Sequence, residues 1–240
     1  MLLLDTTLET PALNLALDEA LLVDSERREY LRFWEPSGHF VVLGRSSPSQ
    51  TEVNLEACSR ERVPVLRRVS GGATILTGPG CLMYALVLDS DSRPDVASVD
   101  SAHRIVLGRL SSALRELDPT VAIAGTSDLV ISREESLRKF SGNSVRITRR
   151  RVLYHGTLLY SFDTDSIARL LLSPSRQPEY RQSREHLSFV SNFPATRTQF
   201  TQLIAQSWNA TEGRLADTVE AQATQLAKTK YSDDAWNLSR

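Results

Sequence analysis

Two short segments carry the side chains best suited to chemistry, and each combines a cation with a glycine turn. They are Arg67-Arg68-Val69-Ser70-Gly71-Gly72-Ala73-Thr74 and Lys139-Phe140-Ser141-Gly142-Asn143-Ser144. Glycine-rich backbone can approach an anion closely and point its N–H groups at it. Arginine adds a fixed fork of donors, whereas lysine adds a mobile point charge. The sequence therefore predicts a pocket for a phosphate or a carboxylate, built from two distant parts of the chain and including both Arg67 and Arg68.

The glycine-rich segment differs from the common nucleotide-binding loops, because it has neither Gly-x-Gly-x-x-Gly nor a Gly-Lys-Ser/Thr ending. A tight turn with solvated arginines would give the same residues, and a lysine beside a turn is usually a surface residue. Asp128 precedes an apolar run and could bind a ribose hydroxyl or a metal-bound phosphate, or cap a turn. Glycine after His155 inside an apolar strand suggests close approach of a ligand or of another backbone.

Composition narrows the class of protein. The 240 residues carry a formal net charge of −1, with 41% hydrophobic and 24% charged residues, so neither nucleic acid nor a membrane is expected as a partner. The 2 Cys, Cys58 and Cys81, are too few for a disulfide framework but are candidate nucleophiles, and the 4 His do not fall at metal-ligand spacing. The apolar start is interpreted as a strand and not as a signal peptide, so a cytoplasmic protein is expected.

Strands dominate the first two thirds of the chain and helices the last third, without regular βαβ alternation, which favours an α+β fold. Apolar residues at helical spacing after Pro11 predict a helix over 11–22. The segments 74–76 and 81–88, joined by Thr77-Gly78-Pro79-Gly80, are predicted to form a hairpin. Further strands are expected at 1–5, 30–34, 39–44, 63–68, 121–123, 128–131, 139–145 and 152–162, and further helices at 53–62, 101–117, 166–172, 198–208 and 215–229.

Eight short motifs, in one order along the chain, resemble the catalytic domain of lipoate–protein ligases, in the superfamily shared with octanoyltransferases and biotin–protein ligases. The resemblance implies a mixed or antiparallel central sheet flanked by helices, in a single catalytic domain over 1–240 without the C-terminal accessory domain of many ligases. The motifs are Asn14-x-Ala16-x-Asp18-Glu19, Arg32-Phe33-Trp34, Val42-Leu43-Gly44-Arg45, Arg67-Arg68-x-Ser70-Gly71-Gly72, Asp128-Leu129-Val130, Lys139-x-Ser141-Gly142-Asn143-Ser144, His155-Gly156-Thr157-Leu158-Leu159 and Lys230-Tyr231-x-x-x-x-Trp236-Asn237.

The same resemblance assigns roles to residues. Lys139 would be the catalytic residue, contacting the acyl carboxylate and the α-phosphate of ATP, and Asp128 would lie near the nucleotide and its Mg²⁺, as a candidate metal contact. The glycine turn would wrap the acyl-adenylate phosphate and the acyl carbonyl, and the histidine motif would line the acyl pocket. The residues implied to bind substrate or nucleotide are Arg68, Ser70, Gly71, Gly72, Ala73, Asp128, Gly142, Asn143, Ser144, His155, Gly156 and Thr157.

The implied activity is two-step acyl transfer. Lipoate would be activated with ATP and Mg²⁺ to lipoyl-AMP, and the lipoyl group would pass to a lysine of a carrier domain of the 2-oxoacid dehydrogenase E2 or glycine cleavage H type. A separate accessory subunit could assist. The basic run Arg146, Arg149, Arg150 and Arg151 could bind phosphate or nucleic acid, but it lacks interleaved aromatic residues, so a solvated hairpin is favoured over a nucleic-acid site. The part around Arg149 to Arg151 could also be a docking surface for an acidic carrier domain.

Departures from the family pattern keep two alternatives open. Ala73 stands where a third glycine is usual, Ser127 stands where Asn is usual, Thr77-Gly78 replaces a His-Asp pair, and Ser46-Ser47 replaces a glutamine. These changes concern the nucleotide pocket, so they question ATP use more than acyl binding. The first alternative is an ATP-independent octanoyl or lipoyl transferase that acts from acyl-carrier protein, through a thioester if a cysteine is suitably placed. The second is a non-catalytic binder of lipoyl groups or carrier domains.

Overall fold

The computed structural model describes residues 1–134, 136–172 and 177–239, and two sheets form its centre. In the larger sheet, β1 runs parallel to both of its neighbours, and the other neighbouring strands pair antiparallel, which confirms the predicted α+β class with a mixed sheet. In spatial order its strands are β11 (Thr211–Glu212), β1 (Leu2–Asp5), β2 (Tyr30–Trp34), β6 (Cys81–Asp89), β10 (Arg151–Leu159), β9 (Ser136–Ile147), β8 (Asp128–Arg133) and β7 (Ala122–Ala124). The smaller sheet contains β4 (Val65–Arg67), β3 (Phe40–Leu43) and β5 (Ile75–Thr77).

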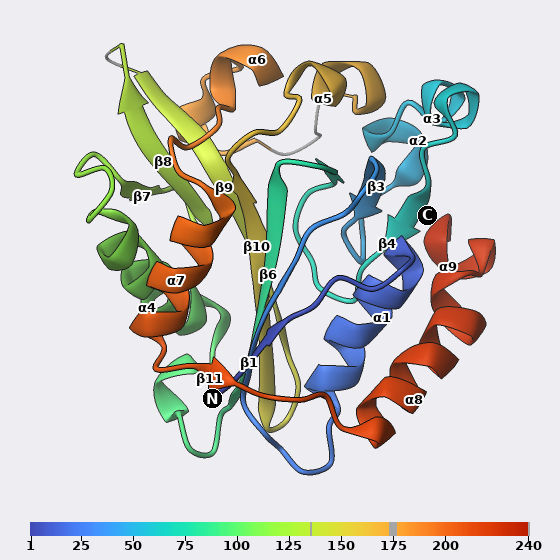
Figure 1. Cartoon of the computed structure of the whole chain (residues 1–240). Coiled ribbons are helices and arrows are strands. Elements are labelled where there is room, and N and C mark those ends of the chain that lie inside the picture. The colour runs from blue at the N-terminus through green and yellow to red at the C-terminus, as the bar shows by residue number, and fades with distance from the viewer. Residues whose placement is uncertain (135, 173–176, 240) are drawn as a thin grey trace.

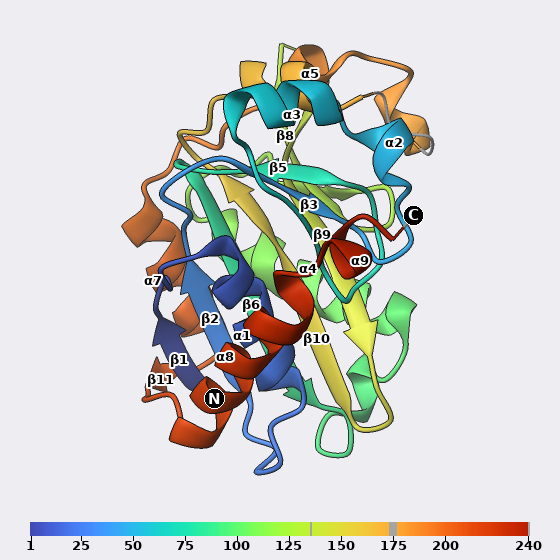
Figure 2. The same cartoon turned by 90° about the vertical axis from the view of Figure 1, so that its right-hand side faces the viewer.

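Helices cover both faces of the larger sheet (Figure 1). The helices α4 (Val99–Leu114) and α7 (Arg197–Ser207) lie on one face, and α1 (Pro11–Leu22) and α8 (Asp217–Leu226) lie on the other. Figure 2 shows the smaller sheet beside two short helices, α2 (Ser49–Glu52) and α3 (Leu55–Glu61). The remaining short elements are η1 (Pro94–Val96), α5 (Asp165–Leu170), η2 (Glu179–Arg181), α6 (His186–Phe189), η3 (Ala227–Tyr231) and α9 (Asp234–Asn237).

The central strand β6 shows why its sequence is continuously apolar. Successive side chains of a strand point to opposite faces of the sheet. Cys81 and Met83 therefore pack in the core shared with α1 and the smaller sheet, whereas Leu82 and Tyr84 pack in the core shared with α4 and α7. Because both faces are covered, neither set of positions can be polar. No helix in the described part of the chain is long and apolar enough to cross a membrane.

The predicted hairpin of segments 74–76 and 81–88 is wrong, although both segments are strands. The first, β5, pairs with β3 in the smaller sheet, and the second, β6, pairs with β2 and β10 in the larger one. Gly80, between the two strands, instead contacts the chain at the end of β10. Gly80 has φ +80°, its carbonyl accepts from Tyr160 N, and a Cβ at this position would lie 2.2 Å from the backbone of Ser161. The turn is thus shaped to meet the end of β10.

The expected helix over 11–22 is confirmed with the same bounds. Thr10 caps it by accepting from Leu13 N, and Pro11 occupies its first turn. The buried face of α1 includes Asn14 and Asp18. The strand pair predicted for 139–145 and 152–162 is also confirmed, as β9 and β10.

The basic hairpin between β9 and β10 is less basic at its surface than its sequence suggests. Arg151 is buried, and its guanidinium donates to the carbonyl oxygens of Leu21 and Arg28 at 3.3 and 2.6 Å. Arg149 and Arg150 remain exposed. The inclusion of Arg151 in a docking surface is therefore wrong.

Arg67 joins the smaller sheet to the end of the chain. Its side chain is fully buried, and Nη1 donates to the carbonyl oxygens of Gly44 and Ser47 at 2.7 and 2.8 Å. Its Nε donates to the carbonyl oxygens of Trp236 and Asn237, both at 3.2 Å. Buried carbonyl groups need such partners, since an unsatisfied one costs free energy. Arg67 therefore holds the chain after β3 and the helix α9 against β4.

We expect Arg67→Met to lower the free energy of unfolding by about 3 kcal/mol, because several buried carbonyl groups lose their donor. Urea denaturation followed by far-UV circular dichroism measures this change. Arg60→Met is the matched control, since that side chain is 65% exposed and its loss should change stability by less than about 0.5 kcal/mol. Equal stability of the two variants would contradict the anchoring role of Arg67.

Candidate active site

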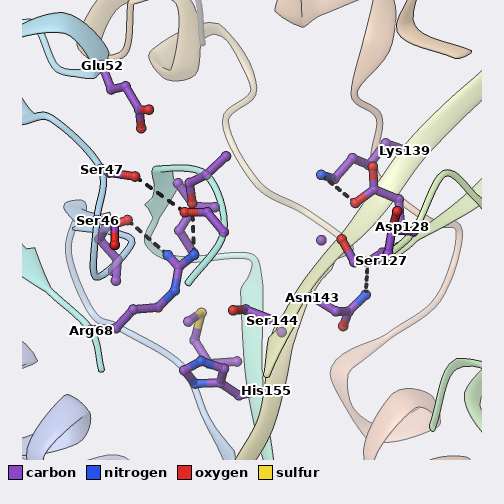
Figure 3. Close-up of a pocket in the computed structure, with 18 of the residues that line it drawn as sticks. Ser46, Ser47, Glu52, Arg68, Ser127, Asp128, Lys139, Asn143, Ser144 and His155 are labelled. Atoms are coloured by element: carbon purple, nitrogen blue, oxygen red, sulfur yellow. Dashed lines mark hydrogen bonds and ion pairs between the residues drawn. The ribbon is translucent and has the colours of Figure 1, made fainter. Parts of the chain in front are cut away.

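A cavity of ≈ 610 Å³ lies between the glycine turn after β4 and the paired strands β9 and β10 (Figure 3). The turn and the strands face one another across it, so the two segments that are distant in sequence meet as expected. The predicted site residues that line it are Arg68, Gly72, Ala73, Asp128, Lys139, Gly142, Asn143, Ser144, His155 and Gly156. Ser70 and Gly71 are not among the lining residues, and Thr157 lines a smaller neighbouring cavity.

Lys139 and Asp128 form an ion pair on one wall of the cavity, with 2.8 Å between Nζ and Oδ1. A β-bulge sets the direction of the lysine. Leu129 pairs with Ser141 and Val130 pairs with Lys139, so Phe140 is an extra residue in β9. Such a residue shifts the alternation of the strand, which brings Lys139 and Gly142 to the same cavity.

Gly142 leaves room for the lysine. A Cβ at this position would lie 2.8 Å from Lys139 Nζ and 2.9 Å from its Cε. The other carboxylate oxygen of Asp128 accepts from the hydroxyl of Tyr180 at 2.7 Å. Both oxygens of this carboxylate therefore have partners, one of which comes from the segment that follows residue 176.

Arg68 shapes the opposite wall. Its Nη2 donates to the carbonyl oxygens of Gly71 and Ala73 at 2.6 and 2.9 Å, and its Nη1 donates to that of Val42 at 3.2 Å. Burial lowers the pKa of Arg68 to about 10, opposed by the carboxylate of Glu52. Most of the guanidinium fork is thus used to hold the turn. Gly72, at φ +85°, supplies the left-handed conformation that the turn requires.

The two neighbouring arginines do not act together on the cavity. Arg67 is not among its lining residues and donates to the main-chain carbonyls of Gly44 and Ser47, whereas Arg68 lines the cavity. Adjacent residues leaving a strand point to opposite sides, and this separates the two side chains. The prediction that both guanidinium groups belong to one anion pocket is therefore wrong for Arg67.

Gly156 confirms the expected close approach of another backbone, because a Cβ there would lie 2.8 Å from the carbonyl oxygen of Gly142, and a side chain comes closer still. A Cβ at Gly156 would lie 2.0 Å from Asn143 Oδ1. That oxygen accepts from the hydroxyl of Tyr84 at 2.5 Å, and the amide of Asn143 donates to Ser127 O at 2.8 Å. Burial lowers the pKa of His155, so its imidazole is neutral near pH 7.

A second cavity of ≈ 140 Å³ adjoins the first, and Lys139, Gly142, Glu52 and Ala73 line both. Its other lining residues are mostly apolar, and they come mainly from β5, β9, β10, α5 and α6 and from the chain next to these elements. The pair of cavities therefore offers a charged centre next to apolar walls. They suit a ligand that joins a charged group to apolar parts.

Comparison with known proteins then assigns a family. The model of the lipoyl protein ligase A/B catalytic domain matches residues 10–208. The chain belongs to this family. It is 28% identical over 175 residues to lipoate-protein ligase A of Blochmanniella floridana, covering 73% of this chain and 50% of that protein. It is 26% identical over 271 residues to octanoyltransferase LipM of Brevibacillus brevis, covering 96% of each.

The fold of this lipoyl ligase family member also matches solved structures. One is a bi-partite lipoate protein ligase studied with its E2 lipoyl domain from Thermoplasma acidophilum. The TM-score is 0.83 at 22% identity, over 99% of this chain and 95% of that chain. The chain spans about half the length of several curated relatives that it matches.

The family motifs locate most of the cavity but miss some of its lining. Asp18 belongs to a family motif but has no predicted role in the site, yet it lines the cavity together with Leu15 from the same helix. An acidic residue on the apolar face of an amphipathic helix is the signal that could have found it. Glu52 and Tyr180 have no such signal, because only the packing of α2 and of the segment after residue 176 brings them to the site.

Neither cysteine of this family member lines either cavity. Cys81 is fully buried and Cys58 is 2% exposed. Burial raises the pKa of both thiols, that of Cys81 to about 12. A thiolate is the nucleophilic form of cysteine, so neither residue is suited to carry an acyl group.

We expect both thiols to react with a disulfide reagent such as DTNB at least ~10³-fold more slowly in the native protein than in concentrated guanidinium chloride, because burial suppresses thiolate and access. The absorbance of the released thiol measures the rate. The variant Ser59→Cys supplies an exposed control thiol next to Cys58 that should react at once. Rapid reaction of either native cysteine in the folded protein would contradict this expectation.

Proposed function

We propose that this chain activates lipoate with ATP and transfers the lipoyl group to a lysine of a carrier domain. The observation that carries the proposal is the arrangement of the cavity. Lys139 and a turn of backbone face one another across it, and no thiol is found among its described lining residues. Family membership supports the acyl class of substrate. The lack of a thiol among the described lining residues supports activation by ATP over a thioester route.

In the first step, an oxygen of the lipoate carboxylate attacks the α-phosphorus of ATP. A mixed anhydride forms, and pyrophosphate leaves. Negative charge increases on the α-phosphate oxygens in the transition state, where the ammonium group of Lys139 would meet it. A preplaced donor of this kind typically contributes ~3 kcal/mol, because it need not reorganise during the reaction. Lys139 acts here as an electrostatic stabiliser and not as a base.

In the second step, the neutral ε-amine of a carrier lysine attacks the carbonyl carbon of the anhydride. An amide forms, the bond between the carbonyl carbon and the phosphate oxygen breaks so that AMP leaves, and the proton of the amine passes to the departing phosphate or to solvent. The carbonyl oxygen becomes negative in the transition state, and the same cation and the N–H groups of the glycine turn would face it. One polar centre would therefore serve both steps, because charge develops on adjoining atoms of the same intermediate.

The residues present fit a Mg²⁺ ion that arrives with the nucleotide. The described residues contain no group of three or more His, Cys, Asp or Glu that could hold a metal by itself. Mg²⁺ is commonly bound by one or two carboxylates together with substrate phosphates. Asp128, on the cavity wall next to Lys139, is the carboxylate that would hold it, and the ion would neutralise phosphate charge.

An octanoyltransferase is the second candidate, and one observation favours it. The relative LipM is 26% identical over 96% of each protein, an identity close to the 28% and 29% found for relatives named as ligases. A transferase that forms a thioester needs a cysteine at the cavity, however, and Cys58 and Cys81 are buried elsewhere. This absence supports the ligase reaction, in which ATP supplies the activation.

The source of acyl activation, ATP or a pre-activated carrier, can be tested directly. The chain is mixed with a lipoyl-acceptor domain under three regimes: lipoate with ATP and Mg²⁺, synthetic lipoyl-adenylate alone, and octanoyl-acyl-carrier protein without ATP. We expect the intact mass of the acceptor to rise by one lipoyl group in the first two regimes and to stay unchanged in the third. An acceptor whose target lysine is replaced by arginine is the control.

Other patterns would reject parts of the proposal. A mass shift with octanoyl-acyl-carrier protein alone identifies an octanoyltransferase. A shift with lipoyl-adenylate but not with ATP shows that activation is performed elsewhere. If the acceptor mass stays unchanged in all three regimes, the remaining candidate is a non-catalytic binder of lipoyl groups or carrier domains.

The stabilising role of Lys139 can be tested by removing its charge. We expect Lys139→Met to lower kcat/KM for lipoyl transfer by about 10²- to 10³-fold, because the charge that develops on the transferred group loses its stabilising cation. Lys228→Met is the matched control, since Lys228 is exposed on η3 and outside both cavities. Thermal unfolding of both variants checks that they fold. Parental activity in a folded Lys139→Met protein would be inconsistent with the proposed mechanism.

A further inference from the structure

A row of buried polar side chains connects the larger sheet to the glycine turn. Each contacts the next, and none is more than 8% exposed. Asp18 Oδ1 lies 2.6 Å from Arg32 Nη1, and its Oδ2 lies 3.8 Å from His155 Nδ1. His155 Nε2 lies 2.5 Å from Ser70 Oγ, which accepts from Arg68 Nε at 3.1 Å. The row ends where Arg68 holds the turn.

The carboxylate of Asp18 favours one tautomer of His155. A neutral imidazole carries one N–H, at either Nδ1 or Nε2. With the proton at Nδ1, the positive end of the N–H bond points toward the carboxylate. With the proton at Nε2, the lone pair of Nδ1 faces the negative charge, which is unfavourable in a buried place. The charged groups around the ring are Asp18 from α1 and Arg68 from the turn, with Arg32 of β2 behind Asp18.

Ser70 favours the same tautomer from the other side. Its oxygen already accepts from Arg68, so its hydroxyl proton needs an acceptor. With the proton of His155 at Nδ1, the free Nε2 accepts that hydroxyl, and every group has a partner. With the proton at Nε2, Ser70 would accept twice, and its own proton would have no other acceptor within the described residues.

We propose that Asp18 is a positioning residue that holds His155 in its Nδ1–H tautomer. Through Ser70 and Arg68, this tautomer fixes the turn from Gly71 to Ala73 that walls the cavity. The lone pair of Nε2 is then occupied by the Ser70 hydroxyl. His155 is therefore a bridge that orients the turn and does not serve as the base that deprotonates the carrier lysine. The consequence for turnover rests on the function proposed above, whereas the tautomer itself does not.

The tautomer can be read directly by NMR. The full chain is labelled with ¹⁵N-histidine, long-range ¹H–¹⁵N correlations are recorded near neutral pH without substrate, and His155→Gln identifies the signals of His155. We expect a pyrrole-type Nδ1 and a pyridine-type Nε2 in the unaltered protein. A pyridine-type Nδ1 overturns the proposal, and this result requires no variant at Asp18 to fold.

Variants then test the cause. Asp18→Asn removes the charge, so we expect the Nε2–H tautomer to become populated, whereas Asp18→Glu retains a carboxylate and the Nδ1–H form. Asn14→Ala is the matched control, because Asn14 Oδ1 also accepts from Arg32, at 2.6 Å, but the residue does not line the cavity. An unchanged tautomer in a folded Asp18→Asn protein, or the same change in Asn14→Ala, overturns the assignment to Asp18.

Kinetics adds a readout of the consequence. We expect Asp18→Asn to lower kcat/KM for lipoyl transfer about tenfold or more, as is common when an orienting partner is lost, with recovery in Asp18→Glu. Equal kcat/KM in the parent and in Asp18→Asn rejects the effect on turnover. The two proposals fail separately. An unaltered protein that shows the Nδ1–H form but never transfers a lipoyl group rejects the proposed function and retains the positioning of His155.

Discussion

Hydrogen bonds from buried arginine side chains to main-chain carbonyl oxygens hold the molecule together around its cavity. Arg32 joins α1 to the larger sheet, Arg67 joins β4 to the end of the chain, and Arg68 holds the glycine turn. A buried guanidinium must satisfy its donors, and irregular backbone must satisfy its carbonyls. The guanidinium donors and the backbone carbonyl acceptors therefore satisfy one another. The loops around the cavity can therefore be irregular and still well packed.

Because of these bonds, some polar side chains of the site hold its backbone in place, and others face the cavity. Arg68 and Ser70 look like ligand-binding groups in the sequence, but their polar atoms are mostly used by the turn and by His155. Lys139 differs, since its flexible chain ends in the cavity beside a single carboxylate. Stabilisation of developing charge, without a nucleophile of the chain's own, is the chemistry that such a centre supports best.

Much of the fold could be predicted from sequence, because its elements follow local rules. The helix over 11–22 has a cap, a proline in its first turn and apolar residues at helical spacing, and these features fix its bounds. The hairpin before Cys81 was wrong because a glycine turn indicates a change of direction but not the partner of each strand. Strand pairing depends on contacts far apart in the chain, such as Gly80 with the end of β10.

The site was predictable to a similar extent. The motifs placed Lys139, Asp128 and the glycine turn in one pocket, and the structure brings them together. Arg67 was wrongly included, although alternation along a strand already separates it from Arg68. Tyr180 was missed because its distance in sequence from Asp128 gives no hint of their contact.

The ion pair between Lys139 and Asp128 makes the binding of oppositely charged ligands interdependent. An anion that approaches Lys139 must compete with Asp128, and a cation that approaches Asp128 must compete with Lys139. Each ligand therefore frees the group that the other requires. By thermodynamic linkage, a cation must raise the affinity for an anion by the same factor as the anion raises the affinity for the cation. A cation at Asp128 and an anion at Lys139 would therefore bind cooperatively, and this cooperativity needs no movement of the backbone.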